Sequence, residues 1–380
     1  PISIPDFFAS RFKDKTGSLR ILIAAIFLIF MVTYVGAQFV GGGKAFFAYF
    51  GIRHGTGIVI TASIVLIYTI LGGFLAVSLT DVLQAIVMIF ALIGLPIYGI
   101  MQKGGFEEVT AQLTSIETGF FNPVAFGFGS LIGLLGIGLG SPGNPHILVR
   151  YMSIKNHRQL KWTAIVGTIW NILLAGGAFM IGIVARAYFP EIQMLPDQDP
   201  ENAYITLANE LLPTALVGIL LASIFAAIMS TADSQLLVAA SSIVRDIYEK
   251  IIHKNKFLPP ERLAMLSRLV VAILVYLAVG LGFIVEDIVF WFVLFAWAGL
   301  GAAIGPTSIQ ALFRKRTTKS GVMAGMIAGT LTVFIWKSNE SLSEWVYELI
   351  PGFIAGWIFT YWVSELEHYL LRRKLRKIKR

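Results

Sequence analysis

A single aspartate, Asp233, interrupts an apolar stretch that runs through residues 216–244 and contains no basic residue. An unpaired carboxylate at the centre of a membrane helix costs about 2.5–3.5 kcal/mol on insertion scales, so it indicates a cation, a proton or a polar helix face as its partner. At helical spacing, small and hydroxylated residues share a face beside it: Ala227, Ser230, Thr231 and Ser234. Hydroxyl, carbonyl and carboxylate oxygens are hard ligands that suit a small alkali cation. The pattern favours an ion site over the alternative, a polar seam between packed helices.

A second carboxylate, Asp81, follows the segment Val77-Ser78-Leu79-Thr80 at the start of another apolar stretch. An acidic residue in the first turn of a helix is stabilised by the helix dipole, which is one interpretation of this position. The other interpretation is an ion relay on the cytoplasmic side that works together with Ser230 and Asp233. The residues alone leave both open.

The most irregular membrane segment covers residues 133–145, with five glycines and two prolines in thirteen positions. Such a composition cannot hold a straight helix. Unwound backbone persists in a membrane only where it is buried in protein or lines a cavity, as in the discontinuous helices of many secondary transporters. Because Pro142 and Pro145 flank the polar Asn144, the segment predicts a broken helix rather than a glycine-rich packing surface that ends in a loop at Ser141.

Other side chains could face a solute or control access to it. Tyr34 and Gln38 are four residues apart on one predicted helix face, where they either bind a solute or bridge helices. Phe295 and Trp297 precede a glycine-rich stretch at residues 299–305. This arrangement is compatible with an aromatic gate, although a packed aromatic layer is the commoner reason for such residues.

The elements that must position these residues are membrane helices. The 380-residue chain is 56% hydrophobic and only 14% charged, with a mean hydropathy of +0.76, which is typical of an all-α polytopic membrane protein. Each uncharged run is near the roughly 20 residues that cross a bilayer, which predicts about ten transmembrane helices. The runs are residues 21–43, 55–80, 82–102, 119–145, 162–185, 211–232, 269–285, 288–313, 320–336 and 349–364.

The residues disfavour an enzyme. The chain has no cysteine, which excludes disulfides, thiol chemistry and cysteine-ligated metals. Its five histidines form no His-x-x-x-His pair for zinc, and no Gly-x-Ser-x-Gly segment for a serine nucleophile is present.

The net charge of +8 follows the loops and does not indicate nucleic-acid binding. If the loops alternate from a cytoplasmic amino terminus, 25 of the 30 basic residues fall on the cytoplasmic side. This bias predicts a cell-membrane protein with both ends of the chain in the cytoplasm. The basic tail, residues 369–380, either rests on anionic membrane lipid or is an ordinary stop-transfer flank.

Several motifs together resemble the sodium:solute symporter family, and within it the sodium/proline symporter branch. The resemblance spans essentially the whole chain. Its motifs are Ile4-Pro5-Asp6-Phe7-Phe8 with Arg11-Phe12; Gly72-Gly73-Phe74-Leu75-Ala76-Val77-Ser78 with Thr80-Asp81 and Gln84; Pro145-His146-Ile147-Leu148-Val149-Arg150-Tyr151-Met152; Ala227-Ile228-Met229-Ser230-Thr231; Ser234-Gln235-Leu236-Leu237-Val238; and Ala296-Trp297-Ala298-Gly299.

The resemblance implies an inverted-repeat core of five plus five helices with peripheral helices. Residues 1–380 are then a single transporter domain that begins at the third core helix, so the first helices of the family core are expected to be missing. The resemblance also implies that Na⁺ binds the Ala227 carbonyl, Ser230 and Thr231. A second ion position would involve Ser230, Asp81, Asp233 and Ser234.

The same resemblance implies sodium-coupled import of a small organic solute by alternating access. Ile137, Ser141 and Asn144 replace the Trp, Tyr and Gln of the proline branch, which enlarges the pocket and puts proline itself in doubt. Another amino acid, a carboxylate or a sugar acid is equally admissible. A proton-coupled transporter that uses Asp233, and a membrane sensory module, are the alternatives.

Overall fold

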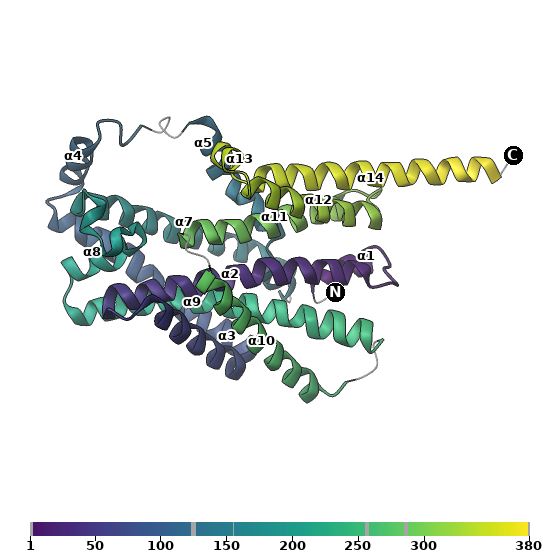
Figure 1. Ribbon diagram of the computed structural model, residues 1–380, viewed down its shortest axis with the longest axis horizontal. Coiled ribbons are helices and arrows are strands. Elements are labelled where there is room, and N and C mark those ends of the chain that lie inside the picture. Colours follow the sequence, from purple (N-terminus) through teal and green to yellow (C-terminus); the bar gives the residue numbers. More distant parts are fainter. Residues whose placement is uncertain (1–2, 123–126, 155, 255–257, 285–287, 379–380) are drawn as a thin grey trace.

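The computed structural model describes residues 3–122, 127–154, 156–254, 258–284 and 288–378, and these ranges contain helices and no strand. The long helices run side by side along the longest axis of the molecule (Figure 1). They are α2 (Ser18–Phe50), α3 (His54–Gln102), α7 (His157–Tyr188), α9 (Thr214–Ser241), α10 (Pro260–Ile284), α11 (Val289–Phe313), α12 (Lys319–Lys337) and α14 (Leu349–Ile378).

Shorter helices connect or extend the long ones. The α-helical connectors are α1 (Ile4–Arg11), α4 (Phe106–Ile116), α5 (Phe128–Gly136), α6 (Pro145–Met152), α8 (Ala203–Leu211) and α13 (Glu340–Trp345). Four 3₁₀ turns, η1 (Ile137–Gly143), η2 (Ile192–Met194), η3 (Pro196–Gln198) and η4 (Pro200–Asn202), precede α6 and α8, and the π-helix η5 (Ser242–Ile252) continues α9.

The described residues contain nine helical segments long and apolar enough to span a membrane, against about ten predicted. α3 supplies two of them, His54–Gly73 and Val77–Gln102, because Gly73 adopts φ 63°, a left-handed conformation that interrupts the helix. The difference arises at the predicted run of residues 119–145. Its described part contains only the shorter apolar segment Phe128–Gly143, and residues 123–126 lie outside the described ranges. The all-α polytopic class is confirmed.

Burial separates central helices from peripheral ones. In the most apolar windows of α2 and α11, 61% and 67% of the residues are buried, against 11% in α7. α2 packs against α3, α9, α10 and α11, and together these helices build the largest hydrophobic core. Exposed apolar side chains on α7, such as Trp162, Ile172 and Phe179, are the surface that a lipid-facing helix requires.

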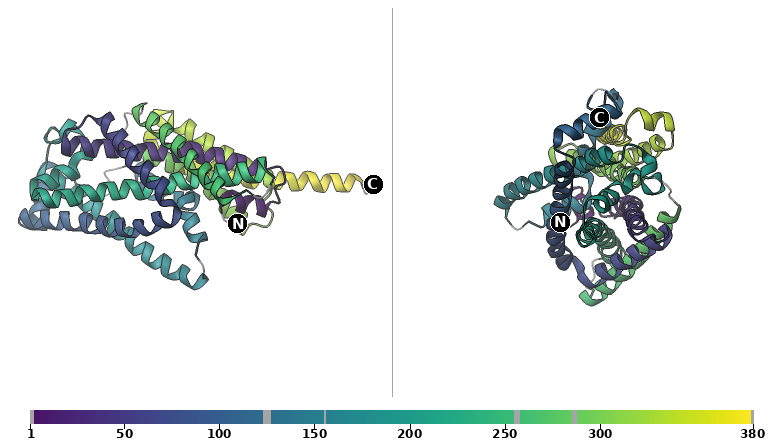
Figure 2. Two further views of the ribbon diagram at one scale, coloured as in Figure 1. Left: turned by 90° about the horizontal axis from the view of Figure 1, so that it is seen from below. Right: turned by 90° about the vertical axis from the view of Figure 1, so that its left-hand side faces the viewer.

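The bundle has two distinct ends. α1, η5 and the end of α14 lie at one end, and α4 and α8 lie at the other (Figure 1). The described part of the predicted basic tail is helical, because α14 continues without a break to Ile378, while Lys379 and Arg380 lie outside the described residues. Figure 2 shows this last part of α14 projecting beyond the other helices.

An ion network fastens α1 to its neighbours at the first of these ends. Arg20 of α2 binds Asp6 at 2.6 Å and Asp246 of η5 at 2.8 Å, and Lys250 binds the same two carboxylates. Burial raises the pKa of Asp6, but the hydrogen bonds and charges of Lys250 and Arg20 outweigh it and leave the pKa below its ordinary value. Because Asp246 is fully buried, this network holds α1, α2 and η5 in one arrangement.

At the other end, Glu201 joins three separate elements. Its carboxylate pairs with Lys44 of α2 and accepts the backbone N–H groups of Val289 and Phe290 at 3.0 Å each. Those N–H groups open α11, where a carboxylate is favoured by the helix dipole. Asp199 pairs with Lys44 at 2.7 Å, so the loop before α8 is tied to α2 and α11.

Candidate functional site

The predicted broken helix is present. α5 passes into the 3₁₀ turn η1, Asn144 is extended at φ −85° and ψ 112°, and α6 begins at Pro145. α11 packs along this break, and the Trp297 indole N–H donates to the Ile137 carbonyl at 2.9 Å. A Cβ on Gly140 would lie 2.1 Å from the Trp297 Nε1, so only glycine permits this approach. The irregular backbone is thus buried against protein, as a membrane requires.

Asn144 offers an unused acceptor at the break. The residue is fully buried, and its amide donates to the Gly140 carbonyl at 2.9 Å. Its Oδ1 is buried and makes no hydrogen bond to any described residue. Buried polar atoms in native proteins nearly always have a partner, so this oxygen is suited to accept a hydrogen bond from a bound molecule.

The predicted solute residues are only partly brought together. The Tyr34 ring contacts His146 edge to face, with ring centroids 6.3 Å apart, and Gln235 of α9 lies 3.2 Å from the His146 Nδ1. Gln38 and Ser141 are partly exposed, as is Ile137, whose carbonyl is bound by Trp297. His146 and Gln235 carry the link between α2, α6 and α9. Both residues belong to motifs of the sequence that predict no role for them, although Gln235 follows Ser234 directly and His146 lies two residues after Asn144.

The two gate candidates differ in their surroundings. Phe295 packs edge to face against Phe30 and Phe334, with centroids 5.7 and 5.5 Å apart. These contacts form an aromatic cluster, which either a gate or a packed aromatic layer would contain. Trp297, two residues later on α11, instead donates a hydrogen bond to Ile137 in the broken segment.

The first predicted ion face lies in the middle of α9. Ala227, Ser230 and Thr231 are all partly exposed, and the Ser230 hydroxyl donates to the Ala227 carbonyl at 3.1 Å. A hydroxyl can turn from such a bond toward a cation, and the carbonyl keeps a second lone pair. This face therefore offers three neutral oxygens from one helix.

The second predicted ion position is charged and buried. Asp81 and Ser234 are each 8% exposed and are bridged by Arg150 of α6, whose Nη2 lies 2.5 Å from the Asp81 Oδ2 and 2.7 Å from the Ser234 Oγ. Asp233 is fully buried beside Ser234, yet neither carboxylate oxygen makes a hydrogen bond of good geometry with any described residue. Asp81 therefore pairs with a residue of another helix, Arg150 of α6. Sequence reasoning missed Arg150, although the motif that contains it was noted.

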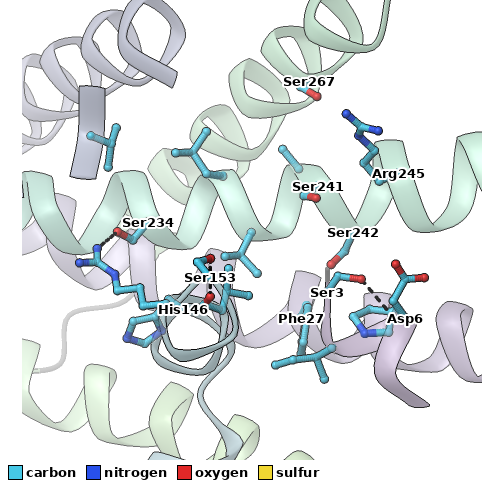
Figure 3. Close-up of a pocket in the computed structure, with 18 of the residues that line it drawn as sticks. Ser3, Asp6, Phe27, His146, Ser153, Ser234, Ser241, Ser242, Arg245 and Ser267 are labelled. Carbon is cyan, nitrogen blue, oxygen red and sulfur yellow. Dashed lines mark hydrogen bonds between the residues drawn. The ribbon is translucent and has the colours of Figure 1, made fainter. Parts of the chain in front are cut away.

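A cavity of about 540 Å³ leads away from this cluster. His146, Arg150 and Ser234 line one part, and Arg245 and Lys250 line another, near the end that holds α1 and η5. Figure 3 shows Ser234 and His146 at one side of the cavity and Ser3, Asp6 and Arg245 at the other. The cavity therefore connects the second ion position with one end of the bundle.

A helical membrane bundle, a discontinuous helix and an oxygen-lined face on the adjacent helix define a secondary transporter. Residues 1–329 match the profile of the Sodium:solute symporter family, and the chain belongs to this family.

Two bacterial relatives are more than a third identical to this chain over the residues that align. The chain is 39% identical over 368 residues to the high-affinity proline transporter PutP of Bacillus subtilis (strain 168). This alignment covers 96% of the chain and 76% of the relative. It is 38% identical over 361 residues to the sodium/proline symporter of Escherichia coli (strain K12), at 93% and 71% coverage.

A solved structure shares the fold. It is the substrate-bound outward-open state of a Na⁺-coupled sialic acid symporter, with a TM-score of 0.76, 21% identity, and coverage of 96% of this chain and 77% of that chain. Together these findings confirm the predicted family, fold class and sodium coupling. The protein is a multi-pass sodium-coupled solute symporter and not an enzyme, and sodium is its coupling ion.

Proposed function

We propose that sodium binds α9 through the Ala227 carbonyl and the hydroxyls of Ser230 and Thr231, and that its binding assembles the solute site at the broken helix. The observation that carries this proposal is the hydrogen bond between Gln235 and His146. Gln235 lies one turn after Thr231 on α9, and through His146 it contacts α6, which belongs to the broken segment. An ion bound at Thr231 would therefore affect the position of α6.

The sodium gradient supplies enough energy for accumulation. One cation that moves down about 100 mV releases about 2.3 kcal/mol, and a tenfold concentration gradient adds about 1.4 kcal/mol. The sum corresponds to several-hundred-fold solute accumulation for each coupled ion. Bound sodium favours the outward-open state only as far as it binds that state more tightly than the inward-open one.

The proposed solute is a small amino acid, with proline as the first candidate. The names of the relatives support proline, and the broken segment is contacted by two aromatic residues, Trp297 at Ile137 and Tyr34 at His146. Ile137 and Ser141 stand where the resemblance to the proline branch implies Trp and Tyr, and smaller side chains there would enlarge the solute pocket. A larger organic acid or sugar acid is therefore the second candidate.

A thermal-shift screen of the purified protein separates the two solute classes. Proline, other amino acids, carboxylates and sugar acids are each added with sodium and with choline. We expect proline to raise the Tm only in sodium, because solute and ion stabilise the same folded state. Stabilisation by a sugar acid and not by any amino acid would contradict the proposed solute.

We further propose that Asp81, Asp233 and Ser234 hold a second cation. The support is their burial, the unpaired oxygens of Asp233 and the carboxylate of Asp81 in the same cluster. Uptake in sodium-free buffer across a pH gradient tests the proton-coupled alternative. We expect no uptake there, because the family couples to sodium.

Both ends of the chain are proposed to lie in the cytoplasm, where the 540 Å³ cavity would open. The basic residues support this orientation, as does the common position of α1 and the end of α14 (Figure 1). Residues 1–380 would then be one transporter domain, with the basic end of α14 near anionic lipid.

Phe295 and Trp297 remain gate candidates.

Single cysteines test this orientation, because the chain has none of its own. Ser267→Cys lines the cavity. Glu340→Cys lies on α13, which follows the end of α12 away from Lys319, the residue that pairs with Asp14 next to α1. A membrane-impermeant maleimide should label Glu340→Cys in intact cells and Ser267→Cys only in inverted vesicles. The reverse pattern would overturn the orientation.

A further inference from the structure

Arg150 connects three helices at the second ion position. A single nitrogen, Nη2, lies 2.5 Å from the Asp81 Oδ2 and 2.7 Å from the Ser234 Oγ, and so joins α6 to α3 and α9. Its contacts are the two that a bound metal cation would make there: one carboxylate oxygen and one hydroxyl oxygen. The guanidinium therefore stands where a cation would stand.

Burial differs sharply between the arginine and its partners. The side chains of Asp81 and Asp233 are buried, whereas 49% of the Arg150 side chain is exposed, and Arg150 is one of the residues that line the cavity. Buried carboxylates without a compensating cation are costly, because desolvation disfavours the charge. The arginine can leave for the water-accessible cavity at low cost, but the carboxylates cannot follow it.

When Asp81 and Asp233 are both ionised, the cluster carries two negative charges and one positive charge. The charges of Asp81 and Arg150 both act on Asp233, so two carboxylates share one guanidinium. Asp233 makes no hydrogen bond of good geometry to a described residue. The cluster is therefore able to attract one more cation, and that cation would compete with Arg150 for the oxygens of Asp81 and Ser234.

We propose that Arg150 is a built-in cation that competes with sodium for the second ion position and stands in for it when the carrier returns empty. This rests on the proposed second ion position. Sodium displaces the guanidinium into the cavity, and after sodium leaves, the guanidinium pairs again with Asp81. The pairing keeps Asp81 neutralised while the carrier reorients, because a bare carboxylate would add to the barrier.

The first test measures sodium affinity. Sodium-dependent thermal stability or tryptophan fluorescence of purified protein gives an apparent Kd for the starting protein, Arg150→Gln and Arg245→Gln. If Arg150 fills the position nine-tenths of the time, its removal tightens the apparent Kd about tenfold. Arg245→Gln is the matched control, because Arg245 lines the same cavity but pairs with Glu249 at 3.5 Å.

The second test separates the empty return from the loaded steps. Proteoliposomes give net solute uptake driven by a sodium gradient, and solute exchange with sodium equal on both sides. Exchange needs no empty return. We expect Arg150→Gln to lose most net uptake and keep exchange, whereas Arg150→Lys keeps the charge and recovers part of the net uptake.

Each other result has a defined meaning. Equal losses of net uptake and exchange in Arg150→Gln, or unchanged sodium affinity, would make Arg150 a structural residue and overturn the proposal. Tighter sodium binding with an unchanged ratio of net uptake to exchange would mean that Arg150 only repels sodium by its charge. That result would also overturn the proposal. If Arg150→Gln does not fold, Arg150→Lys is measured instead. We then expect a smaller decrease in the apparent sodium Kd and a smaller decrease in the ratio of net uptake to exchange.

The second ion position is tested separately by Asp81→Asn. Weaker sodium binding in this variant supports that position, whatever Arg150 does. If Asp81→Asn leaves sodium affinity unchanged, the position itself fails, and the inference about Arg150 fails with it. A failure confined to the Arg150 variants leaves the ion position standing.

Discussion

α9 and the broken segment of α5, η1 and α6 both place polar groups inside the bundle, but they do so in opposite ways. α9 keeps a continuous helical backbone and offers side-chain oxygens, two of them on the buried carboxylate Asp233. The broken segment gives up regular helical pairing and offers an uncharged amide, Asn144, with one unused acceptor. A rigid helix can fix the geometry that an ion needs, whereas an irregular segment can adapt to a solute.

Arg150 and His146 connect these two regions. His146 contacts Gln235, and Arg150 contacts Ser234, so neighbouring residues of α9 are each tied to α6. If sodium binds α9 and the solute binds at the break, as proposed, the two binding events are coupled, since each would move a contact that the other uses.

The largest effect is expected from a substitution at the charged cluster beside α9. Asp81→Asn removes the carboxylate from Arg150 and from the proposed second ion position. A hydrogen bond to a charged group contributes about 1.5–3 kcal/mol, so we expect apparent sodium affinity to fall roughly ten- to hundredfold. Sodium titration of purified protein measures it. Glu340→Gln, on exposed α13, is the control, and an equal shift there would mean a general charge effect.

A smaller effect tests the backbone of the broken segment. In Gly140→Ala the added methyl would lie 2.1 Å from the Trp297 Nε1 and must displace it from the Ile137 carbonyl. Overpacking of this kind costs about 1–3 kcal/mol, so the Tm should fall by several degrees. Gly138→Ala is the matched control in the same turn, because nothing lies within 4 Å of its added methyl. Equal Tm values for the two variants would show that the approach of α11 is not needed.

The smallest effect tests the neutral part of the comparison. Asn144→Leu removes the unused acceptor and the bond to Gly140. One neutral hydrogen bond is worth about 0.5–1.5 kcal/mol, so solute affinity should fall about two- to tenfold. Sodium affinity without solute should stay as it was. If sodium affinity falls and solute affinity does not, the division of labour between the two regions is wrong.

The two regions also differ in how far the sequence predicts them. Asp233 and the hydroxyls at helical spacing predict the ion face of α9, because carboxylates and polar clusters stand out in apolar helices. Glycine and proline density predicts the break at residues 133–145. Both signals are local, and local chemistry can be read directly from the chain.

The contacts that complete each region are not local. Arg150 lies 69 residues from Asp81 and 84 from Ser234, and Trp297 lies 160 residues from Ile137. Nothing in a single sequence brings such residues together, so the arginine in the second ion position could not be predicted. The predicted crossing at residues 119–145 contains, in its described part, only the short apolar segment Phe128–Gly143, because hydropathy alone does not show where a helix is interrupted.

Sodium binding to the α9 face is tested most directly by the apparent sodium affinity of Ser230→Ala with Thr231→Ala. We expect the double variant to need several-fold more sodium for half-maximal solute uptake, with maximal uptake at saturating sodium much less affected. Ser241→Ala, further along α9 and lining the cavity, should match the starting protein. An unchanged sodium requirement in the double variant would contradict the account.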